Sequence, residues 1–232
     1  MYNIDLSRWG IGLPVNDKGK LEGTCVNHYP VPKGFQLKPW FVIEDDGSIT
    51  FRAPVKGART SSNTKYVRCE LRQLEKNGKK TASKIDKDSA LEANLAVRMV
   101  PFKKDKTAGR IVIGQIHGPD DELCRMYYDN GQIYFYDDKA GSKKKETRFT
   151  LVDIHGSPTN IPLGEYFDYD IIVKDKKLIV NVEHDGKLYS ASEPIGSFWK
   201  GKGCYYKAGL YLQVDSTGSG EGEVNFRKLE LK

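Results

Sequence analysis

The stretch Tyr205-Tyr206-Lys207-Ala208-Gly209-Leu210-Tyr211-Leu212-Gln213 has the two-residue alternation of a β-strand. One face presents Tyr206, Ala208, Leu210 and Leu212, which predicts packing on an apolar core. The other face presents Tyr205, Lys207, Tyr211 and Gln213, and we interpret the gap at Gly209 as room for a ligand. The strand is therefore expected to build the core with one face and to bind a polar partner with the other.

Most of the remaining chain also consists of short segments with strand-like character. The clearest hairpin joins 123–128 to 132–136 through Asn130-Gly131, a pair that favours the positive φ angles of a type I′ turn. Helical periodicity is weak, and only 83–89 and 195–200 are expected to form short helical turns. Further strands are predicted at 40–43, 48–53, 66–74, 89–100, 110–117, 166–174, 178–183 and 223–231.

Many short strands with frequent turns and no internal repeat predict an all-β fold. We expect an antiparallel two-sheet β-sandwich, a jelly roll, whose concave sheet forms a substrate cleft. The length of 232 residues suits one large β domain, and no linker-like composition divides it, so 1–232 is expected to be a single domain. The small polar residues of 56–65 predict a loop that covers the cleft, and 139–145 predicts a basic loop.

The net charge of +6 favours an acidic partner, such as a polyanionic polysaccharide, nucleic acid or an anionic membrane. A basic protein without a polyanion partner is the alternative. The basic residues are scattered and the aromatic residues form no RNA-binding pattern, so nucleic acid is not expected. No segment is apolar enough for a membrane span, and we expect a monomer that does not bind membranes.

The four cysteines are Cys25, Cys69, Cys124 and Cys204, and they stand far apart in the sequence. No CxxC or Cys/His cluster occurs, so we expect neither a metal site nor a cofactor. Cys69 and Cys204 share strand parity with apolar neighbours, which favours buried thiols, while a disulfide remains an open alternative. The N-terminus has no signal-peptide features, which indicates either a cytosolic protein or one whose signal peptide was removed.

Two other predicted strands carry polar faces of the same kind. Arg68, Glu70 and Arg72 alternate along 66–74, and Glu70 is expected to hold both guanidinium groups so that their outer edges can bind a carboxylate. A surface ladder of ion pairs is the alternative. Gln115 and His117 share a face at the end of 110–117, where an amide can donate a hydrogen bond and an imidazole can move a proton.

These three strands together predict a carboxylate pocket with an acid and a base beside it. No Ser or Cys is placed for a nucleophilic triad. The paired carboxylates of a retaining glycosidase are also absent. The remaining chemistry is the removal of a proton next to a carboxylate.

The blocks Arg68-Cys69-Glu70-Leu71-Arg72, Gln115-Ile116-His117 and 205–213 resemble the three signature blocks of polysaccharide lyase family 7, the alginate lyases. They occur in the order found in that family, and 6–14 and 51–55 resemble it too, so the resemblance spans the chain. It implies a β-jelly roll that depolymerises alginate by β-elimination. Cys69 departs from the usual Ser or Thr, and Ile116 at its position tends to accompany activity on guluronate-containing blocks.

The resemblance also implies catalytic roles. Arg68 and Gln115, with His117 nearby, would neutralise the uronate carboxylate and stabilise the enolate-like intermediate. Tyr211 would protonate the leaving O4, and we expect Lys207 and the arginines to lower the pKa of its phenol. His117 would remove H5 of guluronate, where H5 and O4 leave from opposite faces, whereas Tyr211 could do both jobs for mannuronate.

The remaining site residues would bind substrate or orient the catalytic groups. Glu70 would orient Arg68 and Arg72, while Arg72 and Lys207 would hold uronate units. Tyr205 and Gln213 would contact sugar, although Tyr205 could also be a packing aromatic. A lyase for another polyuronate such as glucuronan, or a non-catalytic module that binds acidic polysaccharide, remains as an alternative. Because alginate is too large to enter a cell, we expect a secreted or periplasmic protein.

Overall fold

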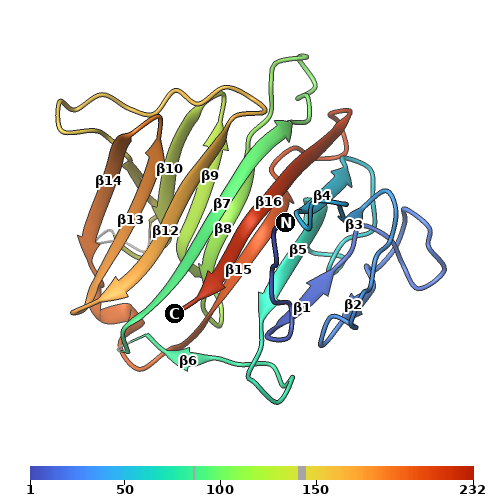
Figure 1. Cartoon of the computed structure of the whole chain (residues 1–232), viewed down its shortest axis with the longest axis horizontal. Helices are drawn as coiled ribbons and strands as arrows, with labels where there is room; N and C mark the ends of the chain where they lie inside the picture. Colours follow the sequence, from blue (N-terminus) through green and yellow to red (C-terminus); the bar gives the residue numbers. More distant parts are fainter. Residues whose placement is uncertain (86, 141–144) are drawn as a thin grey trace.

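The computed structural model describes residues 1–85, 87–140 and 145–232, which form two antiparallel sheets packed face to face (Figure 1). The larger sheet has nine strands in the order β11-β10-β9-β8-β15-β5-β1-β2, with β6 paired to β15. The smaller sheet has seven strands in the order β14-β13-β12-β7-β16-β4-β3. The predicted all-β sandwich is confirmed.

The nine-stranded sheet comprises β1 (Trp9–Gly12), β2 (Asn27–His28), β5 (Arg68–Gln73), β6 (Ser83–Lys84), β8 (Ile111–His117), β9 (Glu122–Asp129), β10 (Gln132–Asp137), β11 (Thr147–Thr150) and β15 (Gly203–Leu212). The seven-stranded sheet comprises β3 (Phe41–Ile43), β4 (Ile49–Pro54), β7 (Ser89–Met99), β12 (Tyr166–Lys174), β13 (Lys177–His184), β14 (Lys187–Pro194) and β16 (Glu221–Leu231).

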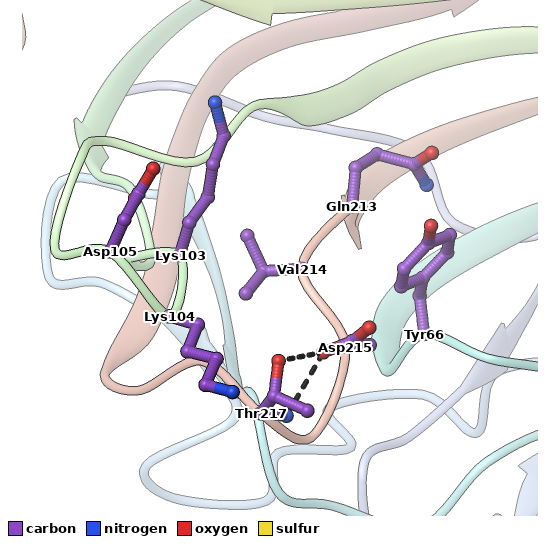
Figure 2. Close-up of a pocket in the computed structure, with 8 residues that line it drawn as sticks. All are labelled: Tyr66, Lys103, Lys104, Asp105, Gln213, Val214, Asp215 and Thr217. Atoms are coloured by element: carbon purple, nitrogen blue, oxygen red, sulfur yellow. Dashed lines mark hydrogen bonds between the residues drawn. The ribbon is translucent and has the colours of Figure 1, made fainter.

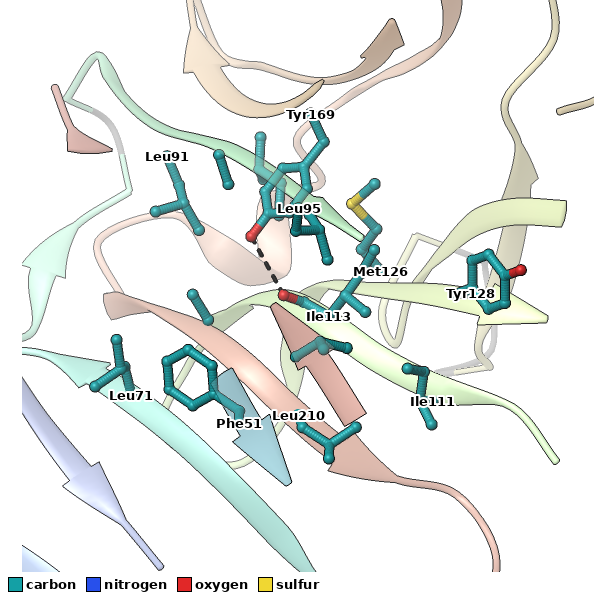
Figure 3. Packing of buried hydrophobic residues seen from close by; sticks show 14 of the residues in the cluster. Phe51, Leu71, Leu91, Leu95, Ile111, Ile113, Met126, Tyr128, Tyr169 and Leu210 are labelled. Atoms are coloured by element: carbon teal, nitrogen blue, oxygen red, sulfur yellow. Dashed lines mark hydrogen bonds between the residues drawn. The ribbon is translucent and has the colours of Figure 1, made fainter. Parts of the chain in front are cut away.

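The core lies between the two sheets, where alternate residues of each strand interdigitate (Figure 3). Phe51 of β4 meets the layer formed by Leu71 of β5 and Leu210 of β15, and all three are fully buried. The Tyr169 hydroxyl of β12 crosses the core and donates a hydrogen bond to the carbonyl of Ile113, 3.2 Å away. Ile113 sits where β8 shifts register against β9, so this bond satisfies a carbonyl at a β-bulge.

The predicted hairpin is confirmed, with β9 and β10 joined through Asn130 and Gly131 at φ angles of 50° and 84°. The helical turn predicted at 195–200 contains the 3-10 helix η1 (Ser197–Trp199). The one predicted at 83–89 is wrong at its start, because Ser83–Lys84 pairs with β15 as β6, and Asp86 lies outside the described residues. Residues 141–144 of the predicted basic loop also lie outside them.

Gly209 has a structural role that differs from the predicted one. Its φ is 128°, and β15 shifts register against β8 between Ala208 and Tyr211. A Cβ at this position would lie 2.9 Å from the Cys69 carbonyl oxygen and 3.1 Å from the Glu70 Cα. The interpretation of Gly209 as room for a ligand is therefore wrong. The glycine permits a bulge and a close approach to β5.

The cysteine side chains lie in the interior of the protein. All four cysteines are free and buried, as predicted for Cys69 and Cys204. Burial raises the pKa of the Cys204 thiol to about 11, so this group stays protonated at neutral pH. Within the described part of the chain, no helix combines the length and apolar character that a bilayer crossing requires.

Candidate active site

The three predicted site strands are direct neighbours in the sheet order β8-β15-β5. On β15, Lys207 lies opposite Gln115 on one side and Arg72 on the other. Tyr205 lies opposite His117, and Tyr211 lies opposite Arg68. Strand parity then places these side chains on the outer face of the sheet, away from the core. Blocks that are far apart in the sequence thus form one polar surface.

This surface is the floor of a hollow of about 240 Å³. Loop residues Thr60, Ser61 and Thr64 form part of its wall, as does the segment around Asn27 and Tyr29. Asn27 and Tyr29 could not be predicted from the sequence, because a strand of two residues has no alternation to detect. The full lining is Gly12, Asn27, Tyr29, Thr60, Ser61, Thr64, Arg68, Glu70, Arg72, His117, Tyr205 and Lys207.

Glu70 is the centre of the charge network, and its side chain is almost completely buried. It accepts hydrogen bonds from Arg68 Nη1 at 3.3 Å, from Lys207 Nζ and from Gln115 Nε2. Burial alone would raise the pKa of Glu70, but the charges of Lys207 and Arg68 hold it below its usual value. Glu70 is therefore an ionised organiser of donors, and two cations make it a weak base.

Arg72 does not share this carboxylate, so the prediction that Glu70 holds both arginines is wrong. The Arg72 guanidinium carbon lies 3.4 Å from the centroid of the Tyr205 ring. Arg72 Nη2 donates a hydrogen bond to the Thr81 carbonyl at 3.5 Å. On the neighbouring strand β15, Gly209 is paired with Glu70 and has no side chain to offer. The Lys207 side chain, which is paired with Arg72, reaches the Glu70 carboxylate instead.

Two buried donors in the hollow have no hydrogen-bond partner among the described residues, namely Arg68 Nε and Arg72 Nε. The Gln115 carbonyl oxygen is also unpartnered there, because its amide nitrogen is directed at Glu70. Buried polar groups are nearly always paired, so unpaired N–H groups on two arginines that line a hollow indicate a place for an anionic ligand. Arg68, Lys207 and Arg72 outnumber the single carboxylate, which leaves the site positive.

His117 has the protonation state that a general base requires. Burial lowers its pKa, and the positive charge of Lys207 lowers it further, so the imidazole is neutral at pH 7. Its Nδ1 faces the Gly118 carbonyl, which can only accept a hydrogen bond. Nδ1 must therefore carry the hydrogen, and Nε2 keeps a free lone pair. Nε2 lies 3.6 Å from Glu122 Oε1.

Tyr205 packs against the His117 ring of β8 and against the Arg72 guanidinium of β5. The His117 ring stacks on it with centroids 5.2 Å apart and an interplanar angle of 12°. Arg72 covers it from β5, the strand on the other side of β15. This packing fixes the orientation of both neighbours. The alternative of a packing aromatic therefore accounts for the position of Tyr205.

Tyr211 lies against Arg68, whose guanidinium carbon is 3.8 Å from the phenol ring centroid. Burial raises the pKa of the Tyr211 phenol, and the charge of Arg68 offsets this only in part. The predicted lowering of this pKa is wrong, because desolvation exceeds the attraction and Lys207 pairs with Glu70 instead. The phenol stays protonated at neutral pH, which suits a proton donor.

Gln213 lies apart from the other predicted site residues. It borders a separate hollow of about 580 Å³, together with Tyr66, Lys103, Lys104 and Asp215 (Figure 2). Its Nε2 donates a hydrogen bond to the Leu212 carbonyl at 2.8 Å. Tyr66 of this second hollow packs edge-on against Tyr211, with ring centroids 6.1 Å apart.

The fold and the site define a β-sandwich with a cationic cleft that contains a neutral imidazole, and the protonated phenol of Tyr211 packs against Arg68 of this cleft without lining it. A family model described as alginate lyase matches residues 4–232. An alginate lyase of Klebsiella pneumoniae is 29% identical over 276 aligned residues, which cover 99% of this chain and 89% of that protein.

Solved structures agree with this relationship. The crystal structure of the Klebsiella pneumoniae enzyme has a TM-score of 0.81 and 26% identity, covering 98% of this chain and 95% of that one. The alginate lyase of Pseudomonas aeruginosa also has a TM-score of 0.81 and 26% identity, with coverage of 98% and 99%. The chain belongs to the alginate lyase family, polysaccharide lyase family 7.

Proposed function

We propose that this alginate lyase cleaves guluronate-containing blocks by β-elimination and leaves a 4,5-unsaturated uronate at the new chain end. The observation that carries the proposal is the separation of the two proton-transfer groups. His117 of β8 pairs with Tyr205 of β15, and Tyr211 lies on β15 itself, so the two groups are on opposite sides of Lys207 along this strand. Guluronate requires removal of H5 and protonation of O4 on opposite faces, which suits two separate groups.

In this mechanism the uronate carboxylate binds at the guanidinium groups of Arg68 and Arg72, which line the hollow. The positive site stabilises the dianion that forms when C5 loses its proton. His117 Nε2 takes H5, the electron pair forms the C4–C5 double bond, and the C4–O4 bond breaks. The Tyr211 hydroxyl gives its proton to O4. Glu70 takes no proton and keeps Arg68, Lys207 and Gln115 in place.

The substrate class is supported by a related structure. A family 7 alginate lyase with 22% identity and a TM-score of 0.78 has been solved with the product GGG. We propose that this chain binds alginate oligosaccharides in the hollow over Arg68 and Lys207. Ile116 is buried beneath the sheet, so any influence it has on specificity acts through the placement of its neighbours Gln115 and His117. We also propose that residues 1–232 act as a single secreted or periplasmic catalytic domain.

Replacing Tyr211 with Phe tests the acid role. The ring and its contact with Arg68 are kept, while the transferable proton is lost. The absorbance of the unsaturated product should then rise at least about a hundredfold more slowly. Thermal unfolding should be unchanged. Near-normal turnover by a folded Tyr211→Phe protein would remove Tyr211 from this role.

Replacing His117 with Ala tests both the base role and the block preference. Cleavage of polyguluronate should fall roughly a hundredfold or more, whereas cleavage of polymannuronate should fall less, because Tyr211 can serve both steps there. The ratio of kcat/KM values on the two polymers measures the difference. An equal loss on both would mean that His117 does not act as the guluronate base.

The loop 56–65 is proposed as a lid because Thr60, Ser61 and Thr64 line the hollow directly. Shortening the loop by removing 61–63 should raise KM and change the product length. Unchanged KM and product length would contradict this. For the whole protein, product absorbance on purified glucuronan and alginate separates the proposed activity from a lyase of other specificity, and a lack of absorbance on both indicates a binding module.

A further inference from the structure

The outer face of the nine-stranded sheet continues beyond Tyr211 over β8, β9, β10 and β11. There it carries a second constellation, which the sequence motifs do not include. We call it the arginine–tyrosine patch, and it consists of Arg110, Tyr127, Tyr134, Tyr136 and Arg148.

The tyrosines form a fixed floor. Tyr127 and Tyr134 stack with centroids 5.2 Å apart and an interplanar angle of 16°, and both are almost completely buried. Tyr136 packs edge-on against them at 5.5 and 5.7 Å. The Tyr134 hydroxyl donates a hydrogen bond to Asp129 Oδ2 at 2.9 Å, which holds the phenol in one orientation.

Two guanidinium groups lie on this floor. The Arg148 guanidinium carbon is 3.7 Å from the Tyr134 ring centroid, and that of Arg110 is 4.5 Å from the Tyr127 centroid. Arg110 Nη1 also donates to the Tyr134 hydroxyl at 3.0 Å. Cation–π contact holds both arginines on the rings before any ligand binds, and the hydrogen bond to Tyr134 adds to this for Arg110.

Neither Arg110 nor Arg148 contacts a carboxylate directly within the described residues: Arg110 reaches Asp129 only through the Tyr134 hydroxyl, and Arg148 Nη2 donates to Gln132 Oε1 at 3.4 Å. In residues 1–85, 87–140 and 145–232, neither forms a salt bridge, and 141–144 contains no acidic residue. The contrast with Arg125 on the same face is direct. That guanidinium contacts carboxylates of Glu122, Asp138 and Glu146. Two guanidiniums without a direct carboxylate partner can receive an anion, because their planar forks match a carboxylate.

The patch is continuous with the catalytic residues. Tyr211 packs against the cluster of Val112, Tyr127 and Tyr134. Tyr134 is on β10, three strands from β15, which corresponds to a distance of about 15 Å between strands. The hollow that holds Arg72 and Asn27 lies on the other side of Tyr211, toward β5, β1 and β2.

We propose that the arginine–tyrosine patch binds the carboxylate of a uronate unit on the leaving-group side of the bond being broken. The inference rests on the proposed function. Tyr211 protonates O4, so the sugar that leaves with O4 lies beyond Tyr211 when viewed from Arg72, and this direction leads to β9 and β10. Arg110 and Arg148 bind the carboxylate, and the partly exposed Tyr136 supports the ring.

The test is the double variant Arg110→Gln/Arg148→Gln, compared with the control Lys177→Gln/Lys187→Gln, which removes two exposed charges from the other sheet. Initial rates are measured by product absorbance on alginate oligosaccharides of increasing length. The patch variant should lose about tenfold in kcat/KM on long oligosaccharides, which corresponds to about 1.4 kcal/mol of binding. The shortest cleavable oligosaccharide should react normally, and the control should match the wild type at every length.

The outcomes separate the two proposals. If the wild type releases no unsaturated product from alginate, the proposed function fails. If the wild type is active and the patch variant loses nothing, or loses equally at every length, the patch is not a subsite. Arg148→Gln alone covers the case in which the double variant is unfolded, since Arg148 is exposed. Arg148→Gln should show a smaller loss of kcat/KM that also grows with oligosaccharide length. If this single variant loses nothing on long oligosaccharides, the inference is overturned.

Discussion

Glu70 on β5 and Asp137 on β10 are both buried carboxyl groups of the same sheet, yet they meet burial in opposite ways. Glu70 contacts the cations of Arg68 and Lys207 as well as the Gln115 amide, and it stays ionised. Asp137 accepts hydrogen bonds from the Lys139 backbone N–H at 2.7 Å and from Trp199 Nε1 at 3.2 Å, and it forms no salt bridge within the described residues.

Asp137 instead meets Glu193 of β14, on the opposite sheet. Burial raises the pKa of Asp137, and burial together with the adjacent Asp137 raises the pKa of Glu193. Glu193 therefore keeps its proton and uses it to donate a hydrogen bond to the Asp137 carboxylate. The same desolvation cost is met by cations at one site and by a proton at the other. Of these two sites, the one around Glu70 leaves donors for an anionic ligand. The Asp137–Glu193 pair has no such donors and only connects the two sheets.

Removing the charge of Glu70 should have the largest effect. Glu70→Gln leaves Arg68 and Lys207 buried without a counter-charge, which should cost about 3–5 kcal/mol of unfolding free energy. Activity should fall by about a hundredfold or more, because the donors lose their organiser. Urea unfolding and product absorbance measure the two quantities. A Glu70→Gln protein with normal stability and turnover would contradict the role of this network.

The pH dependence of kcat/KM should report the cationic site. Burial, with the charge of Arg68, lowers the pKa of Lys207 to about 8, so charge and activity should fall tenfold per pH unit above this value. On the acid side, activity should fall only below pH 6.5, because the pKa of His117 is lowered. Tyr211 titrates at higher pH. An alkaline limb near pH 10 or above would assign the loss to Tyr211 rather than to Lys207.

Changes at Tyr205 should have a smaller effect through the orientation of His117. Tyr205→Phe keeps the ring between Arg72 and His117 and should stay within about twofold of the wild type. Tyr205→Leu removes the stacking and should lower kcat about tenfold, with the acid limb of the pH profile shifted. If the Phe variant is as impaired as the Leu variant, the hydroxyl rather than the ring matters.

The smallest effect is expected at the Asp137–Glu193 pair. A substitution there should raise the unfolding free energy, whereas Glu70→Gln should lower it. Because the pKa of Glu193 is raised in the folded state, the folded protein loses stability as pH rises from the unfolded value of about 4.3 through the folded pKa. Glu193→Gln supplies a permanent donor to Asp137. It should raise the unfolding free energy at pH 9 by about 1 kcal/mol, with little change at pH 5 and normal activity. Equal stability of both proteins at pH 9 would mean that no proton is shared.

The strands and the polar faces could be predicted from the sequence because side-chain alternation is a local property. That is why Arg68, His117 and Tyr211 were placed on the outer face of the sheet correctly. The register could not be predicted, since it arises from pairing between distant segments. The strand pairing brings Lys207 into a salt bridge with Glu70, a place that the sequence had suggested for Arg72. It also leaves Gln213 in a separate hollow.

The sequence by itself determined an all-β chain whose three polar strand faces resemble those of the alginate lyases, because each face depends only on residue order. Tertiary structure alone decided the protonation states. The phenol of Tyr211 lies next to a cation, yet its pKa rises, because desolvation depends on everything packed around the group. The tertiary structure also decided the structural role of Gly209. The cost of a side chain there arises from the backbone of β5, a strand more than a hundred residues away in the sequence.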